Sequence, residues 1–227
     1  MTPLWLTRYS KTHAEMVTSH FSPSFQACGI DKAFDLRLVE ENYNAGEFGT
    51  HNFNEWGRIV MGMNLDLFKK NIGNIVVVSG CDIRFYADIS KDIFAVVEKY
   101  EFAAIHDVFV PACGDFNAFK VTPRIIDLFV WIIENDSKFR NQQWTLNAGL
   151  RVMGIQLFSF GTDYWTVGMS NGGKIWQPGD PVLPPPTIKM HHANFAVGVV
   201  NKLLLLKQCL GMTKMNRRGM KESGASS

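Results

Sequence analysis

A run of four aliphatic residues, Ile75 to Val78 within the segment NIVVVSG, places the tightest limit on the fold. It has no polar alternation, which predicts a central strand buried on both faces. An amphipathic helix is predicted at Asp88–Tyr100, between this strand and the next apolar run at Phe102–Val110. Strands that alternate with helices in this way predict an α/β domain with a mostly parallel central sheet flanked by helices.

The rest of the chain continues the alternation. Further strands are predicted at Pro3–Tyr9, Ala118–Val121, Leu157–Phe160 and Ile188–Met190, and further helices at Glu55–Lys70, Pro123–Asn135 and near 195–210. Residues 31–54 and 170–187 are predicted loops, and the second is long enough to be functional or mobile. We expect one domain over residues 1–212, followed at 213–227 by a disordered tail or a linker to further domains.

Charge and cysteine content exclude several classes of function. The chain has 23 Lys and Arg against 21 Asp and Glu, and the last seventeen residues account for more than the whole net charge of +2. The remainder is close to neutral, so we expect no binding of nucleic acid through overall charge. The four cysteines show no Cys-x-x-Cys spacing and no apolar run approaches 18 residues, which excludes a zinc knuckle and a membrane span. Free thiols and no visible signal peptide predict a cytoplasmic protein.

Asp82 follows the buried strand directly, in the sequence Ser79-Gly80-Cys81-Asp82. In open α/β sheets ligands bind at the carboxyl ends of the strands, so a carboxylate here is well placed for binding. The alternative is that Asp82 only forms a turn, a common role for aspartate.

A second candidate is His191-His192-Ala193-Asn194, which we place at the start of the C-terminal helix. Helix N-termini favour anions, and an imidazole there is suited to a metal or a phosphate. Lys202 would lie about two turns further along the same face as Asn194. Alternatively, Asn194 is an N-cap, the histidines are incidental and Lys202 is solvated.

Two more segments combine amides with aromatic residues. They are Asp115-Phe116-Asn117-Ala118-Phe119 and the stretch from Asn141 to Asn147. Such residues suit the recognition of sugar hydroxyls, but they are equally common in turns and helix caps.

In this order, the segments resemble the nucleotide-diphospho-sugar glycosyltransferases of the GT-A fold. The stretch VVVSGCDIRF is similar to a buried strand ending in an Asp-x-Asp motif, and Asp115–Val121 is similar to a second family segment. Gln143 and Asn147 are in register with a third, and Glu55-Trp56-x-Arg58 resembles the helix before the motif strand. The most specific match, to the pattern HANxxVGxxNK, comprises His192, Ala193, Asn194, Val197, Gly198, Asn201 and Lys202. The resemblance covers about residues 4–207, and the chain is also similar to the N-terminal glycosyltransferase domain of a multidomain chlorovirus protein.

Two positions depart from the family pattern. Gly80 stands where the first aspartate of the motif is expected, and Gln142 stands where an acidic residue is expected in the later segment. The first change weakens a two-carboxylate metal site, and the second removes a candidate acid or nucleophile.

The resemblance implies a single-domain glycosyltransferase that moves a sugar from a UDP-sugar to a glycan or glycoprotein acceptor, with retention of configuration. It implies that Asp82 and His192 bind Mn²⁺ or Mg²⁺, which stabilises the leaving diphosphate. It assigns donor contacts to Thr7, Arg8, Tyr9, Arg58, Gly80, Cys81, Asn194, Gly198 and Lys202, and sugar contacts or catalysis to Asn117, Gln142, Gln143, Asp115 and Asp163.

Two other classes of function stay open. A sugar-nucleotide nucleotidyltransferase usually has a glycine-rich phosphate loop after its first strand, and TRYSKTH has no glycine. A non-catalytic nucleotide-sugar or carbohydrate-binding module is consistent with the lost acidic residues at positions 80 and 142.

Overall fold

The computed structural model describes residues 1–41, 51–138 and 141–224, without the side chains of residues 51–59, 137 and 215–224. Its centre is a six-stranded sheet in the order β2-β1-β3-β6-β5-β7. These strands are β1 (Leu4–Ser10), β2 (Asp35–Glu41), β3 (Ile75–Ser79), β5 (Phe102–Ile105), β6 (Phe116–Lys120) and β7 (Leu157–Phe160). The predicted α/β architecture with a mostly parallel, mixed sheet is confirmed.

Strand β6 alone reverses the direction of the large sheet. It pairs antiparallel with β3 and with β5, whereas β1 pairs parallel with β2 and β3, and β5 pairs parallel with β7. The segment that enters β6 therefore lies beside the segment that leaves β3. This topology brings Asp115 next to the Gly80-Cys81-Asp82 turn.

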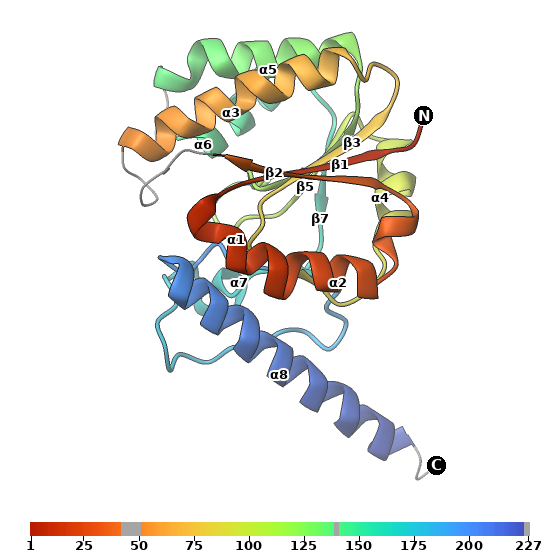
Figure 1. Ribbon diagram of the computed structural model, residues 1–227, viewed down its shortest axis with the longest axis vertical. Coiled ribbons are helices and arrows are strands. Elements are labelled where there is room, and N and C mark those ends of the chain that lie inside the picture. The colour runs from red at the N-terminus through yellow and green to blue at the C-terminus, as the bar shows by residue number, and fades with distance from the viewer. Residues whose placement is uncertain (42–50, 139–140, 225–227) are drawn as a thin grey trace.

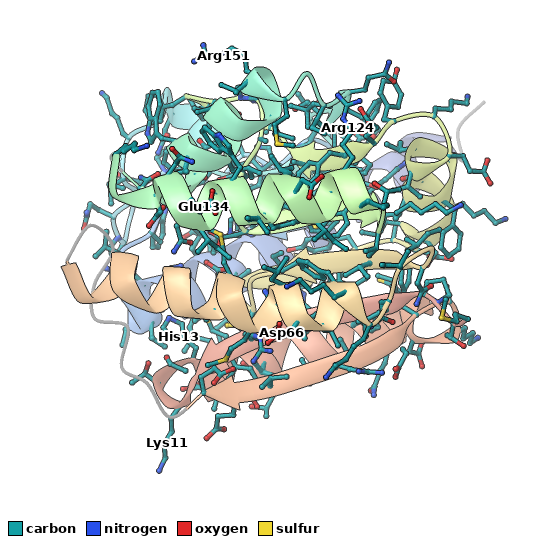
Figure 2. All side chains as sticks on the ribbon, turned by 90° about the horizontal axis from the view of Figure 1, so that it is seen from above. Lys11, His13, Asp66, Arg124, Glu134 and Arg151 are labelled. Atoms are coloured by element: carbon teal, nitrogen blue, oxygen red, sulfur yellow. The ribbon has the colours of Figure 1, made fainter. Side chains whose placement is uncertain are left out.

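Helices cover both faces of the large sheet (Figure 1). Helices α3 (His51–Lys69), α5 (Pro123–Asn135) and α6 (Gln142–Val152) lie on one face, and α2 (Ser22–Ala27) and α4 (Ser90–Val97) pack on the other. Figure 2 shows α3 and α5 side by side above the sheet. Val76 packs in the core between the sheet and α3, α5 and α6, whereas Val77 packs in the core between the sheet and α2 and α4, because successive strand residues point to opposite faces. This double burial explains the unbroken aliphatic run.

A small sheet in the order β4-β9-β8 lies beyond the carboxyl end of β3. It consists of β4 (Ile83–Phe85), β8 (Tyr164–Trp165) and β9 (Met190–His192). The last helix, α8 (Val199–Gly224), packs Leu205, Leu206 and Cys209 into a third buried cluster beside this sheet. The remaining elements are η1 (Lys11–His13), α1 (Ala14–Met16), η2 (Val17–Phe21), η3 (Ile30–Lys32), η4 (Asp136–Lys138) and α7 (Gly168–Asn171).

Several sequence predictions need correction. Residues 31–54 are not all loop, because β2 occupies Asp35–Glu41 and α3 begins at His51. Strand β2 is a largely exposed edge strand rich in charge, so it lacks the apolar run that revealed β3. Helix α8 extends through the segment 213–224, and whether this segment connects to further domains stays a prediction.

The loop 170–187 is anchored to the body of the protein at two buried residues. Trp176 and Val182 are buried in the third cluster, and the Trp176 backbone N–H donates to the Phe195 carbonyl at 2.7 Å. Among the described residues, no helix combines the length and the apolar character that a membrane crossing requires.

Candidate active site

The site is built around the turn that follows β3. The Gly80 N–H donates to the Asp115 carbonyl at 2.8 Å, which joins this turn to the segment entering β6. Asp82 then leads into β4, whose Ile83 pairs antiparallel with His192 of β9. The Ala193 N–H donates to the Asp82 carbonyl at 2.9 Å. The backbone alone therefore places Asp82, Asp115 and His192 together.

His192 reaches Asp82 from a strand and not from a helix, which corrects the sequence prediction. Helix α8 begins only at Val199, and Gly198 before it has a φ of +80°, a conformation that glycine adopts without strain. The Lys202 N–H donates to the Gly198 carbonyl at 3.1 Å, so Lys202 lies in the first turn of α8. Asn194 precedes the helix and accepts a hydrogen bond from the Thr166 hydroxyl, so Asn194 and Lys202 do not share a helix face.

The side chains of Asp82, His192 and Lys202 form a compact charged cluster. The Asp82 Oδ1 atom lies 3.3 Å from His192 Nε2, and Lys202 Nζ donates to Asp82 Oδ2. His192 is fully buried, and the Asp82 side chain is 9% exposed. Asp115 stands at the edge of the cluster, with Oδ2 3.8 Å from His192 Nε2 and a side chain that is 59% exposed.

The charged groups in this cluster shift one another's pKa values. Burial alone would raise the pKa of Asp82, but Lys202 and His192 hold it well below its usual range. Burial would lower the pKa of His192, but Asp82 and then Cys113 raise it well above its usual range. Neighbouring His191 has no such partner, and burial followed by the charge of His192 lowers its pKa to about 3. The cluster is thus a buried ion pair, and His191 stays neutral beside it.

The two predicted metal ligands, Asp82 and His192, are brought together. Over the described parts of the chain, no three His, Cys, Asp or Glu side chains converge well enough to hold a metal ion by themselves. His192 Nε2 is buried without a partner of good hydrogen-bond geometry, and it faces the Asp82 carboxylate. One imidazole and one carboxylate fit Mn²⁺ or Mg²⁺ as a partial ligand set, completed by oxygens from substrate and water.

Other predicted residues meet at the same edge of the sheet. A cavity of about 170 Å³ opens beside Gly80 between the sheet and helices α3, α5 and α6. Its lining includes Arg8, Gly80, Asp115, Asn117, Gln142 and Gln143. The Arg8 guanidinium donates to Asn64 and pairs with Glu41, which fixes it on this side.

The Gln143 side chain makes its hydrogen bonds to other protein groups and not into the cavity that it lines. Its Nε2 donates to Asp107 Oδ2 at 2.7 Å, and its Oε1 accepts from the Gly114 N–H at 3.3 Å. Asn147, one turn later, holds the Ala112 carbonyl and N–H in the same way. These two amides clamp the segment 112–114 onto α6, so their geometry favours positioning over sugar contact.

The structure separates three other predicted residues from the cluster. The Thr7 hydroxyl is buried and lies 2.9 Å from the Ser79 hydroxyl, so it is used inside the sheet. Tyr9 lies on the same strand face as Thr7 and packs against the third cluster together with buried Cys81. The Asp163 side chain accepts from the Thr187 hydroxyl, and its backbone carbonyl accepts from the Lys189 N–H just before β9, whereas His192 is the last residue of that strand. The side chain of Arg58 lies outside the described residues.

Sequence reasoning missed His13, Asp107 and Cys113. His13 follows β1, and its pKa is lowered by burial and then by the charge of Lys202, which places it near the cluster. Asp107 is buried, and its Oδ1 has no hydrogen-bond partner. Cys113 Sγ lies 3.9 Å from His192 Nδ1. The only available signal for them was their position just after a strand or just before one.

No protein-family model matches the chain, and no curated protein matches it. Solved structures do match. The apo form of the glycosyltransferase GlyE of Streptococcus pneumoniae TIGR4 superposes with a TM-score of 0.58 at 12% identity, over 94% of this chain and 64% of that one. An active-site mutant of LgtC gives a TM-score of 0.57 at 11% identity, over 84% and 86% of the two chains. The chain has a GT-A fold.

A third structure with the GT-A fold is a glycosyltransferase involved in the glycosylation of the major capsid of PBCV-1. It gives a TM-score of 0.55 at 8% identity, over 90% of this chain and 100% of that one. The present chain spans just under two thirds of the length of GlyE. At these identities the likeness establishes the fold, and activity has to be argued from the site.

Proposed function

We propose that the protein is a metal-dependent glycosyltransferase that transfers a sugar from a UDP-sugar to a glycan or glycoprotein acceptor with retention of configuration. The observation that carries the proposal is the cluster of Asp82, His192 and Lys202 at the carboxyl end of β3. It adjoins a cavity lined by Asn117 and Gln142 in a fold shared with glycosyltransferases.

The charges in the cluster suit a diphosphate. A bound Mn²⁺ or Mg²⁺ would supply the charge stabilisation that the leaving diphosphate needs. Asp82 and His192 would hold that cation, and Lys202, whose ammonium is at present paired with Asp82, would supply a further positive charge. The absence of a side chain at Gly80 leaves backbone close to the donor, which favours a close approach by phosphate or ribose.

Retention is compatible with a same-face displacement. In that step the bond from the anomeric carbon to the diphosphate breaks as the bond to the acceptor oxygen forms, and the acceptor proton passes to the departing phosphate oxygen. No protein nucleophile is required. Asp115, the exposed carboxylate beside His192, would be left to orient the reacting groups.

Hydrolysis and transfer assays with a panel of UDP- and GDP-sugars test the proposal, each in Mn²⁺ and in EDTA. We expect metal-dependent release of UDP, and nuclear magnetic resonance of the product would show the donor's anomeric configuration. Lys202→Met should lower turnover at least about tenfold through lost stabilisation of the diphosphate. Lys207→Met, on the exposed side of the same helix, is the matched control.

A non-catalytic binding module is the second candidate, because Gly80 and Gln142 replace acidic residues. Metal-dependent UDP-sugar binding without any turnover, across donors and acceptors, would favour it over the enzyme.

A further inference from the structure

The cavity beside Gly80 combines a polar opening with an apolar floor. Asp115 and Gln142 border it where the protein surface is accessible, and Phe68 and Ile132 line it where no side-chain surface reaches solvent. The apolar lining residues are Val60, Met61, Phe68, Val78, Phe129, Ile132 and Leu146. Water in such a floor has few hydrogen-bond partners, so the floor favours an apolar group.

One buried polar atom lies at the cavity without a partner. Asn117 is 5% exposed, and its Oδ1 has no hydrogen-bond partner in the structure. Its Nδ2 donates to the Gly114 carbonyl at 2.6 Å, and because a carbonyl only accepts, the amide orientation is determined. No protein group donates to this Oδ1, so a ligand that brings a donor here would remove the cost of leaving it buried and unpaired.

The sheet register places this atom at the wall of the apolar floor. Asn117 of β6 is the direct antiparallel partner of Val78 of β3, so the two side chains point to the same face of the sheet. That face packs against α3, α5 and α6, as the burial of the next same-face residue, Phe119, in their core shows. A ligand group that reaches Asn117 therefore also meets the floor.

We infer, building on the proposed function, that the donor is an N-acetylhexosamine nucleotide, whose acetamido group enters this cavity. The acetamido N–H donates to Asn117 Oδ1, and its methyl group packs on the floor formed by Phe68, Leu146 and their neighbours. A plain hydroxyl would satisfy Asn117 but leave the floor without contacts. A carboxylate would bring no donor and would bury a charge, which makes a uronic acid a poor fit.

Binding measurements with UDP-GlcNAc, UDP-GalNAc, UDP-Glc and UDP-Gal in Mn²⁺ test this inference, with UDP alone as the reference. A methyl group in an apolar pocket discriminates roughly 10- to 200-fold, so we expect an acetamido donor to bind at least about tenfold more tightly than its hydroxyl counterpart. UDP binding with equal or tighter binding of UDP-Glc or UDP-Gal overturns the inference and leaves the proposed function standing. Failure of UDP itself to bind overturns both.

Two variants locate the preference within the protein. Met61→Phe narrows the cavity and should lower the affinity ratio of UDP-GlcNAc to UDP-Glc about tenfold. Met63→Phe is the matched control, because Met63 lies on the same helix but is exposed and outside the lining. Asn117→Ala should weaken binding of both UDP-GlcNAc and UDP-Glc relative to UDP alone, because an acetamido N–H and a hydroxyl can each donate to Oδ1. An unchanged ratio in Met61→Phe, or an Asn117→Ala variant that binds both sugar donors as tightly as the parent, contradicts the inference.

Discussion

The charged cluster and the cavity, on either side of Gly80, differ in how completely their polar groups find partners within the protein. In the cluster of Asp82, His192 and Lys202 opposite charges meet, and each group has a charged partner. In the cavity, the side-chain Oδ1 of Asn117 is buried and has no hydrogen-bond partner. The cluster must exchange contacts when a ligand arrives, whereas the cavity only gains them. We therefore expect the cluster to determine stability and the cavity to determine which ligand is preferred.

Removing the central carboxylate should have the largest effect. Asp82→Ala leaves His192 and Lys202 without their counter-charge in a mostly buried site, and the free energy of unfolding should fall by about 3 kcal/mol. Urea denaturation measures this, and calorimetry with UDP and Mn²⁺ should show that metal-dependent binding is lost. The double variant Asp82→Ala with Lys202→Met should recover part of the stability. A single variant as stable as the parent would mean that the cluster is not a stabilising ion pair.

A side chain at position 80 should disturb the cluster of Asp82, His192 and Lys202. Gly80 has no positive φ, but a Cβ atom there would lie 2.8 Å from Asp82 Oδ1. Gly80→Ala should therefore displace the Asp82 carboxylate and cost about 1–2 kcal/mol of stability. Gly80→Asp should weaken Mn²⁺-dependent binding too, although the family pattern has an aspartate there. Gly62→Ala, with open space around its Cβ, is the control, and thermal unfolding compares all three.

The two adjacent histidines should give stability opposite dependences on pH. The pKa of His192 is raised, so its contribution is complete below about pH 6.5 and is lost as pH rises through the folded value. The pKa of His191 is lowered to about 3, so stability is lost as pH falls below about 6.5.

Urea unfolding in metal-free buffer at several pH values separates the two effects. Each pKa unit of difference between folded and unfolded protein corresponds to about 1.4 kcal/mol. His192→Gln should remove the loss on the alkaline side, and His191→Phe should reduce the loss on the acid side. Parallel pH profiles in the two variants would contradict the opposite shifts.

The sequence predicted the elements that are apolar and continuous. Pro123–Asn135 has the expected bounds because it buries a regular apolar stripe, and Leu157–Phe160 also has the expected bounds, although of its residues only Phe160 is buried. It missed β2, which is an exposed edge strand, and β4 and β8, which have three and two residues. Strands this short carry too little periodicity to be recognised.

Part of the site could be predicted and part could not. Asp82 and His192, which the family resemblance assigns as metal ligands, do lie side by side, although His192 lies on β9 instead of a helix, and metal binding by them stays a prediction. Gln143 was expected to contact sugar, but it holds Asp107 and the Gly114 N–H. Whether an amide points to a ligand or to a neighbouring loop depends on contacts between distant segments, and these leave no local pattern in the chain.

Helix α8 connects the Lys202 ammonium to a distant part of the molecule. Lys202 lies in the first turn of α8, and the helix extends to Gly224, away from the rest of the chain (Figure 1). Between these ends, Leu205, Leu206 and Cys209 are fully buried and Thr213 is 3% exposed, so these residues anchor the helix to the body of the protein. A rotation of α8 about these buried residues would move the Lys202 ammonium relative to the Asp82 carboxylate with which it pairs.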